Sequence, residues 1–383
     1  MTTKLTEIIN FSEKIQKIGT YEEIKASIIK PYEDILNNLQ EVYIFGAKEL
    51  GKRFYEFFSQ AGIKVLGFID NDPNKQNQEF CDCKILNIKD LADKKEQITI
   101  VIASIYYLHE INKQLKELGF KKVVPCPVFY LLDSNIYKAE PSFDGIVEDL
   151  ACNKQKYLNL YNLLEDEKSK IILENLVNFR LTFDFSVFSR IIAPDACIGQ
   201  YFKEDFLKFG ENDIFIDGGG FDGDTTLKFI DKVNNKYKKI LFFEPDEDSF
   251  LKAQENLKKY ENIEFIKKGL YSKSAVFRFN LSGGLGSTID QDGNTEIEVA
   301  SIDEILDKKV DYIKMDIEGA ELEALKGTKK QLEQGVQFAI SLYHKSEDIW
   351  EIPEYIKQIN PAYKFYLRHY TNAIFETVLY AVV

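Results

Sequence analysis

Apolar residues along this chain occur in short unbroken runs, and the longer stretches between them alternate apolar and polar residues with a helical spacing. Short apolar runs are typical of strands buried on both faces, and the alternating stretches are typical of amphipathic helices. Two β-rich runs at the end of the chain predict a hairpin around Thr371-Asn372-Ala373, so a parallel sheet should finish with a reversed strand. The predicted strands of this half are residues 214–216, 240–243, 263–266, 310–315, 337–343, 363–370 and 377–383.

The same alternation occurs in the first half of the chain, where a second α/β unit is predicted. Its expected strands are residues 42–45, 65–69, 98–103 and 121–125. The apolar stripe at the N-terminus is typical of packing or of a dimer surface, so a homo-oligomer stays open. A chain of 383 residues is long enough for two domains. We predict an α/β protein with N-terminal helices (1–40), a Rossmann-like accessory domain (41–133), a helical connector (134–204) and a larger α/β domain (205–383).

The first predicted strand of the larger domain ends in a turn that is rich in glycine and in acidic residues. Asp217 is followed by Gly218, Gly219 and Gly220, and an amphipathic stretch begins soon afterwards. A strand that breaks into glycines before a helix lets a ligand approach the backbone beside a helix N-terminus. Carboxylates crowd this turn, which disfavours a pyrophosphate and suits a cationic ligand such as S-adenosylmethionine. The predicted ligand-binding residues of the turn are Asp217, Gly218, Gly219, Asp222, Asp224 and Thr225.

A further acidic residue follows the next predicted strand. Glu244 comes directly after the apolar run 240–243. A carboxylate at the tip of the second strand of such a sheet can accept both hydroxyls of a ribose. The competing interpretation is a helix start at Glu244-Pro245-Asp246. The glycine turn and the acid together favour the adenosine-binding half of a doubly wound sheet.

The pieces of sequence that follow the predicted strands also form a recognisable series. They are Phe215-Ile216-Asp217-Gly218-Gly219, Asp222-Gly223-Asp224-Thr225, Phe243-Glu244-Pro245, Ser301-Ile302-Asp303-Glu304, Ile313-Lys314-Met315-Asp316-Ile317-Glu318-Gly319-Ala320-Glu321 and Tyr343-His344-Lys345. With this series, the segment from about residue 201 to 383 resembles the FkbM-type methyltransferases. Gly220 departs from the family, which often has alanine or another small residue at this place.

The resemblance implies a class I methyltransferase sheet, S-adenosylmethionine as cofactor and methyl transfer to an oxygen, most often of a sugar or a polyketide. The tail Leu367-Arg368-His369-Tyr370 with Glu376–Tyr380 is similar to a sub-group tied to sugar and polysaccharide modification, such as capsule biosynthesis. The expected cofactor set then also includes Tyr201, Glu244, Pro245, Gly269, Leu270 and Asp316. The expected substrate-binding set is Ser287, Thr288, Glu318, Tyr343, Lys345, Arg368 and Tyr370.

Methyl transfer to a hydroxyl requires a base within reach, or a metal that lowers the pKa of the hydroxyl. His344 follows the predicted strand 337–343, at the edge where open α/β sheets bind ligands, and we expect it to be neutral near pH 7 and to act as the base. His369 is a second candidate for a catalytic role. Asp316 and Glu318 are expected to hold the methionine ammonium, to act as base, or to ligate Mg²⁺. Too few oxygen ligands are assignable to predict a metal site.

The predicted accessory domain has a degraded phosphate turn. Lys48 occupies the place where a dinucleotide fingerprint has its second glycine, and Glu49 opposes an anion. A working NAD site is therefore not expected. An NAD-dependent sugar oxidoreductase and a non-catalytic protein that binds sugar nucleotides for assembly remain the alternative functions.

Composition narrows the classes of partner. The formal net charge is −13, which argues against nucleic acid and anionic membranes as partners and leaves a sugar or sugar nucleotide. No segment has the length of a membrane span or a signal-peptide core, so a cytoplasmic location without membrane insertion is expected. The five cysteines form no Cys-x-x-Cys pair and are expected to be reduced thiols. The abundance of Lys, Ile and Asn indicates an AT-rich bacterial genome.

Overall fold

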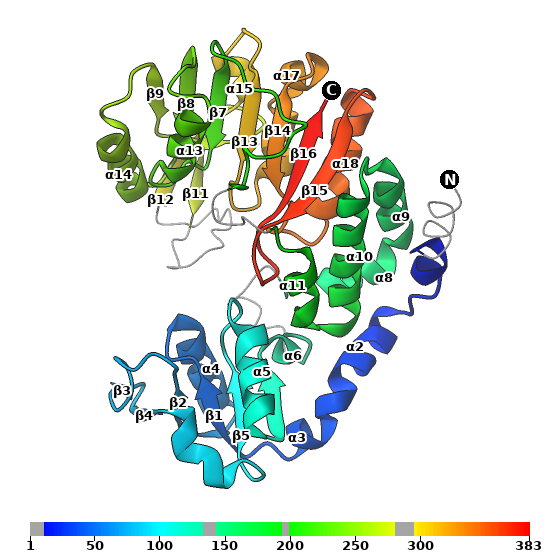
Figure 1. The fold of residues 1–383 in the computed structure, drawn as a ribbon, viewed down its shortest axis with the longest axis vertical. Coiled ribbons are helices and arrows are strands. Elements are labelled where there is room, and N and C mark those ends of the chain that lie inside the picture. The colour runs from blue at the N-terminus through cyan, green and yellow to red at the C-terminus, as the bar shows by residue number, and fades with distance from the viewer. Residues whose placement is uncertain (1–10, 133–142, 194–198, 280–294) are drawn as a thin grey trace. The chain divides into compact units, whose positions relative to one another are not determined.

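The computed structural model describes residues 11–132, 143–193, 199–279 and 295–383 (Figure 1). Contacts between residues divide the chain into two compact units. The N-terminal unit consists of Met1–Lys154, Glu174–Arg190 and Thr371–Ile374, and the C-terminal unit consists of Gln155–Leu173, Ile191–Tyr370 and Phe375–Val383. Each unit thus combines segments that are far apart in the sequence.

The N-terminal unit is built on a six-stranded sheet in the order β3-β4-β2-β1-β5-β6. All neighbouring strands are parallel except the β3–β4 pair. The four strands predicted from apolar runs are present, whereas β3 and β4 are too short and too polar to have been predicted. The strands are β1 (Glu41–Phe45), β2 (Lys64–Ile69), β3 (Glu79–Phe80), β4 (Cys83–Leu86), β5 (Thr99–Ile102) and β6 (Lys122–Pro125).

Helices connect these strands and supply the rest of the N-terminal unit. The helix α10 (Glu167–Thr182) contributes its residues from Glu174 onward. The other helices are α2 (Tyr21–Ile29), η1 (Lys30–Tyr32), α3 (Glu33–Asn37), α4 (Glu49–Gln60), η2 (Ile88–Lys94), α5 (Leu108–Leu118), α6 (Pro127–Tyr130), α8 (Ile146–Cys152), η4 (Phe185–Val187) and α11 (Phe188–Ile191), of which Ile191 belongs to the C-terminal unit.

The turn between β1 and α4 is closed by its own side chains. The carboxylate of Asp70, at the end of β2, accepts a hydrogen bond from the backbone N–H of Ala47 at 3.1 Å. Lys75 donates both to this carboxylate and to the carbonyl of Ala47, at 3.0 Å each. A Cβ at Gly51 would lie 1.9 Å from the carbonyl oxygen of Gly46, so this glycine is required for packing of the turn. A bound dinucleotide would use the Asp70 carboxylate and the Ala47 amide, but these two groups bind each other.

The C-terminal unit is built on a seven-stranded sheet in the order β15-β16-β14-β13-β7-β8-β9. Strands β14, β13, β7, β8 and β9 are parallel, and β16 is antiparallel to both of its neighbours. This confirms the predicted Rossmann-like methyltransferase sheet with a reversed last strand. The strands are β7 (Ile214–Gly218), β8 (Lys239–Phe243), β9 (Ile263–Ile266), β13 (Tyr312–Met315), β14 (Gln337–Ser341), β15 (Lys364–His369) and β16 (Thr377–Val382).

A small second sheet, in the order β10-β12-β11, accompanies the main sheet of the C-terminal unit. Its strands β10 (Gly269–Leu270), β11 (Ala275–Phe279) and β12 (Thr295–Ala300) were not predicted, because β10 is two residues long and charged residues interrupt the apolar run in β11 and β12. The helices of this unit are α9 (Lys154–Leu163, from Gln155 onward), α10 up to Leu173, α13 (Asp224–Lys232), α14 (Glu247–Leu257), α15 (Ile302–Ile305), α16 (Glu321–Lys326), α17 (Lys329–Glu333) and α18 (Asp348–Ile359).

Aromatic side chains fill the core between the main sheet and its helices. Phe215 of β7 stacks on Phe229 of α13 at 4.3 Å between ring centroids, and on Tyr312 of β13 at 5.7 Å. These rings are fully buried. A tightly packed core fixes the register of the strands, so the ends of β7 and β13 are held rigidly.

The register brings the carboxyl ends of the central strands together at one edge. Gly218 of β7 pairs with Phe243 of β8 on one side and with Met315 of β13 on the other. The residues that follow these strands are therefore neighbours, as expected for the ligand-binding edge of an open α/β sheet. Among the described residues, no helix is both long and apolar enough to span a membrane.

Candidate active site

The glycine turn after β7 is supported from beneath by a buried ion pair. The Asp217 carboxylate is fully buried, accepts a hydrogen bond from the Thr226 hydroxyl at 2.7 Å and lies 3.3 Å from the ammonium of Lys314. Lys314 pairs with Asp217 in register across β13 and β7, and it donates to the carbonyls of Gly218 and Gly219 at 3.2 and 2.7 Å. Burial disfavours the charged form of Lys314, but the carboxylates of Asp217 and Asp316 outweigh burial and raise its pKa. Asp217 thus anchors the turn instead of facing a ligand.

The glycines of the turn are required by close packing. Gly219 has a φ of +72°, and a Cβ there would lie 1.9 Å from the carbonyl oxygen of Asp316. A Cβ at Gly220 would lie 2.1 Å from the ring of Phe242. The departure from the family at position 220 therefore has a local cause, because the Phe242 ring occupies the space that an alanine methyl group would need.

Glu244 links the end of β8 to the glycine turn. Its Oε2 accepts from the backbone N–H of Phe221 at 2.9 Å, and its Oε1 accepts from the backbone N–H of Asp246 at 2.9 Å. Burial raises the pKa of this carboxyl group. Each carboxylate oxygen has a second lone pair, so Glu244 can still accept hydrogen bonds from a ligand. The helix start expected at Glu244-Pro245-Asp246 is present, with Asp246 as the N-cap of α14, and the ribose interpretation of Glu244 stays a prediction.

The other predicted cofactor residues surround the same edge of the sheet. Asp224 is exposed, begins α13 and forms an ion pair with Lys228 at 3.1 Å. Thr225 is buried in the first turn of that helix, and Asp222 is half-buried with its carbonyl bound by Asn256. Gly269 and Leu270 form β10, and the Leu270 side chain would be 2.5 Å from a Cβ at Gly218. Pro245 lies within reach of β10 as well, about 4.0 Å from the position of a Cβ at Gly269.

Asp316 is the centre of a hydrogen-bonded group at the end of β13. Its Oδ2 accepts from the hydroxyl of Tyr201 at 3.1 Å, and its Oδ1 accepts from the hydroxyl of Tyr343 at 2.9 Å. Burial opposes the charged form of Asp316, but Lys314 and His344 outweigh burial and lower its pKa. The carboxylate is therefore ionised and held in a fixed orientation. Tyr201, predicted to contact the cofactor, has a φ of +73° and donates its backbone N–H to Tyr380.

Three carboxylates face the imidazole of His344. Its Nδ1 lies 2.9 Å from Glu321, and its Nε2 lies 3.5 Å from Asp316 and 3.6 Å from Glu318. The loop after β13 folds back because Glu318 and the following Gly319 adopt φ values of +55° and +93°. This places Asp316 and Glu318 on the same nitrogen, although the backbone between them is not extended as the sequence suggested. We call Asp316, Glu318, Glu321 and His344 the histidine–carboxylate cluster.

The charge state of this cluster differs from the prediction. Burial alone would lower the pKa of His344, but the carboxylates of Glu321, Asp316 and Glu318 raise it to about 10. Burial raises the pKa of Glu318. The expectation of an imidazole that is neutral near pH 7 is therefore wrong, since His344 keeps its second proton there. The physical reason is that three carboxylates surround one buried imidazole and stabilise its protonated form.

Two acidic residues of this region were missed as functional candidates. Glu321 is fully buried in the first turn of α16 and accepts from the backbone N–H of Ile317 at 2.9 Å. Asp348 begins α18 and accepts from the backbone N–H of Lys345; burial and the Glu321 carboxylate raise its pKa to about 8. Glu321 lies in the run Glu-Gly-Ala-Glu. Acids are common in the first turn of a helix, so this position gave no signal that Glu321 would contact His344.

Three predicted residues from the tail of the chain lie in the core of the C-terminal unit. His369 is fully buried in β15, with Nδ1 2.9 Å from the Thr377 hydroxyl. Arg368 forms ion pairs with Asp166 at 2.8 Å and with Glu204 at 2.7 Å. The hydroxyl of Tyr370 lies 2.6 Å from that of Tyr380. Their polar groups bind other residues of the protein, so these three residues have structural roles.

The remaining predicted substrate residues are divided between the rim of the site and an undescribed segment. Lys345 is exposed beside His344, and its side chain would lie 3.3 Å from a Cβ at Gly319. Tyr343 orients Asp316, as described above. Ser287 and Thr288, together with the glycine-rich loop that contains them, lie outside the described residues.

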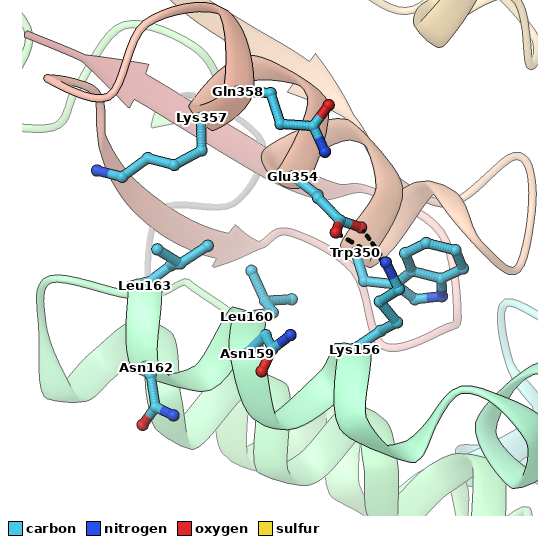
Figure 2. A pocket seen from close by; sticks show the side chains of 9 residues that line it. All are labelled: Lys156, Asn159, Leu160, Asn162, Leu163, Trp350, Glu354, Lys357 and Gln358. Carbon is cyan, nitrogen blue, oxygen red and sulfur yellow. Dashed lines mark hydrogen bonds and ion pairs between the residues drawn. The ribbon is translucent and has the colours of Figure 1, made fainter.

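A separate cavity of about 410 Å³ lies between α9 and α18 (Figure 2). At its edge Lys156 forms an ion pair with Glu354 at 2.6 Å and covers the ring of Trp350 at 5.3 Å. Figure 2 shows Asn159 and Gln358 on opposite walls. None of its lining residues belongs to the glycine turn or to the histidine–carboxylate cluster, so this cavity is not part of the candidate active site.

Comparison with known proteins agrees with this architecture. Residues 210–370 match the family model described as methyltransferase FkbM domain, and residues 38–124 match the model described as C2185-like, N-terminal. No curated protein sequence matches this chain. Among solved structures, methyltransferase FkbM from Methylobacillus flagellatus KT has 22% sequence identity, covers 98% of each chain and has a TM-score of 0.80. It shares the fold of this chain over nearly its whole length.

Other solved structures overlap only in part. An rRNA methylase from Streptococcus thermophilus is 17% identical, covers 45% of this chain and 86% of its own, and has a TM-score of 0.31. Fibrillarin from Aeropyrum pernix with natively bound S-adenosyl-L-methionine is 10% identical, with 46% and 70% covered and a TM-score of 0.31. The family match over residues 210–370 and the order of the strands are the decisive findings. The chain therefore carries a methyltransferase FkbM domain over residues 210–370.

Proposed function

We propose that this chain transfers a methyl group from S-adenosylmethionine to a hydroxyl group of a sugar, either linked to a nucleotide or in a precursor of a surface or capsular polysaccharide. The observation that carries the proposal is the position of Glu244. Its carboxylate lies at the tip of β8 and binds the backbone of the glycine turn, with a lone pair left on each oxygen. A ribose needs two adjacent acceptors of this kind.

The charges at this edge of the sheet fit a cationic cofactor. Lys314 is paired with Asp217 beneath the turn, and the carboxylates of Glu244 and Asp316 follow the neighbouring strands β8 and β13 at the same edge. Glu244 would hold the ribose and Asp316 the ammonium of the methionine part. When bound, S-adenosylmethionine supplies an activated methyl group, so the chief task of the protein is to position the acceptor.

The histidine–carboxylate cluster is our proposal for the acceptor side of the site. His344 carries a proton at neutral pH, so it would orient the acceptor oxygen through a charged hydrogen bond rather than remove its proton. Glu318 is half-exposed, and burial raises its pKa, which makes it the better proton acceptor. Lys345 at the rim would contact a further oxygen of the sugar or a phosphate. A cytoplasmic enzyme of bacterial origin fits this proposal.

Glu244 provides the first test. We expect Glu244→Ala to weaken binding of S-adenosylmethionine by ~1.5–3 kcal/mol, the range for hydrogen bonds to a charged group. Isothermal titration calorimetry measures this directly. Because Glu244 also binds the backbone N–H of Phe221, Glu244→Gln serves as a control that keeps an acceptor oxygen beside the turn. Unchanged affinity in both variants would place the cofactor elsewhere.

The same titration with NAD tests the oxidoreductase alternative. We expect the N-terminal unit to bind NAD weakly or not at all, because Asp70 and the Ala47 amide are bonded to each other and Lys75 closes the turn. Lys48→Gly restores the glycine of the fingerprint and should not change this result. A tight NAD complex that is lost in Asp70→Ala would overturn the expectation and revive the oxidoreductase.

The acceptor is best sought with a panel of nucleotide-linked sugars. Release of S-adenosylhomocysteine in the presence of one member of the panel would support sugar methylation. A protein that binds such sugars but releases none, with cofactor bound, would instead be an assembly protein.

A further inference from the structure

The histidine–carboxylate cluster holds more negative than positive charge. Asp316, Glu318 and Glu321 each have a carboxylate oxygen within 3.6 Å of a ring nitrogen of His344. Within the cluster, three acids surround a single imidazole, and an imidazole that ligates a metal is neutral and compensates none of them. Each buried acid that remains uncompensated is costly unless a cation or hydrogen-bond donors face it. A divalent cation would therefore balance the excess negative charge of the cluster.

Unpartnered polar atoms point to the same conclusion independently. Among the described residues, both ring nitrogens of His344 and the Oε2 of Glu321 are buried without a partner in hydrogen-bond geometry. The His344 side chain is 8% exposed and that of Glu321 is fully buried. The contact between them is short enough for an ion pair, but its direction does not suit a hydrogen bond. Buried polar atoms are rarely left in this state, and a metal ion is one of the partners that would satisfy them.

The spacing of the side chains agrees with a single ion. One ligand atom from each of Asp316, Glu321 and His344 can be chosen so that all lie within 4.8 Å of one another. Ligands about 2.0–2.6 Å from one ion lie at most roughly 4–5 Å apart. We propose that Asp316, Glu321 and His344 bind one divalent cation. Glu318, which is half-exposed, then remains free at the outer side of the site.

The ligand set selects among cations. Two carboxylates suit Mg²⁺, Ca²⁺ and Mn²⁺, whereas an imidazole is a poor ligand for the first two. Mn²⁺ accepts both kinds of ligand and keeps open positions for water or substrate. We therefore assign Mn²⁺ as the preferred ion, with Mg²⁺ as a weaker competitor. Binding of the ion would displace the second proton of His344, so that one ring nitrogen ligates the ion and the other donates its N–H to a carboxylate, which fixes the ring orientation.

A cation at this place would have a chemical role in methyl transfer. This role rests on the proposed function, whereas the cation site itself does not. A sugar hydroxyl bound to a divalent ion has a lower pKa and loses its proton more readily to Glu318. The proton passes to the carboxylate, the oxygen forms its bond to the methyl carbon, and the bond from that carbon to sulfur breaks. The ion takes no part in electron transfer.

Binding of Mn²⁺ alone tests the site without any enzyme assay. Electron paramagnetic resonance of protein freed of metal with EDTA should show one Mn²⁺ bound per chain, displaced by excess Mg²⁺. Asp316→Asn and His344→Gln should each weaken binding at least about tenfold. Glu255→Gln, which removes an exposed acid of α14, is the matched control and should bind as the unaltered protein does.

Spectroscopy of the bound ion covers the case in which a variant does not fold. Electron spin-echo modulation from an imidazole nitrogen should appear in the unaltered protein and in His109→Gln, whose substitution lies in α5 of the N-terminal unit. Absence of stoichiometric Mn²⁺ binding, or binding without this nitrogen signal, would overturn the assignment. If S-adenosylmethionine binds and methyl transfer continues in EDTA, the metal site fails while the proposed function stands. Stoichiometric Mn²⁺ binding by a protein that does not bind S-adenosylmethionine would support the metal site and contradict the proposed function.

Discussion

Replacing Lys314 by methionine is expected to lower the free energy of unfolding of the C-terminal unit by about 3–5 kcal/mol, the cost of removing one partner of a buried ion pair. The substitution leaves the Asp217 carboxylate buried with only the Thr226 hydroxyl as partner, and it frees the carbonyls of Gly218 and Gly219. Urea unfolding followed through Trp350, the single tryptophan of the chain and a residue of α18, reports on this unit.

The control for this prediction is the pair Lys228–Asp224 on α13, which is partly exposed at 3.1 Å. Lys228→Met should change the free energy of unfolding by less than about 1 kcal/mol. Adding Asp217→Asn to Lys314→Met should recover part of the loss, because no buried charge then remains unpaired. A Lys314→Met variant as stable as the control would show that the pair contributes little.

His344→Ala is expected to lower the turnover rate by ~10²–10⁴-fold, the range for a group that assists proton transfer or stabilises the charge that develops at the acceptor oxygen. Binding of S-adenosylmethionine should survive, because Glu244 and the glycine turn do not depend on His344. The measurement is the rate of S-adenosylhomocysteine release with an acceptor found in the panel, at saturating cofactor. His109→Gln should leave this rate unchanged.

Two other outcomes for His344 would be informative. Loss of cofactor affinity with an unchanged rate per bound complex would make His344 a cofactor-binding residue and would contradict its place on the acceptor side. A turnover rate in His344→Ala equal to that of the unaltered protein would place the acceptor away from the histidine–carboxylate cluster. Either result is distinguishable from unfolding by the Trp350 fluorescence of the variant.

Much of the sheet was predictable because buried parallel strands give unbroken apolar runs that end abruptly in glycine or acid. Asp217, Glu244 and Asp316 each follow such a run, so their place at one edge of the sheet could be inferred without coordinates. The short strands β3, β4 and β10 carry no run of this kind. Their pairing depends on contacts with distant strands, which local sequence does not specify.

The roles of individual polar residues were harder to predict. Arg368 and Tyr370 are two positions apart in a tail that resembles sugar-modifying enzymes, yet Arg368 forms ion pairs with Asp166 and Glu204. Sequence spacing shows which face of a strand a residue occupies, but it does not show what covers that face. The pKa of His344 was mispredicted for a related reason, since Glu321 approaches it only after the loop at Glu318 and Gly319 folds back.

The discontinuous make-up of the C-terminal unit also has a consequence for synthesis on the ribosome. Its early segment reaches the sheet through Asp166, which binds Arg368, and through Ser169, which binds the backbone of Leu367. The first pair is separated by 202 positions in the chain. At ~5–20 residues per second, Asp166 must wait roughly 10–40 s for its partner to emerge. We therefore expect the polypeptide to complete this unit only once the segment that contains Arg368 has left the ribosome, and a fragment that starts at residue 205 to lack part of what covers β15.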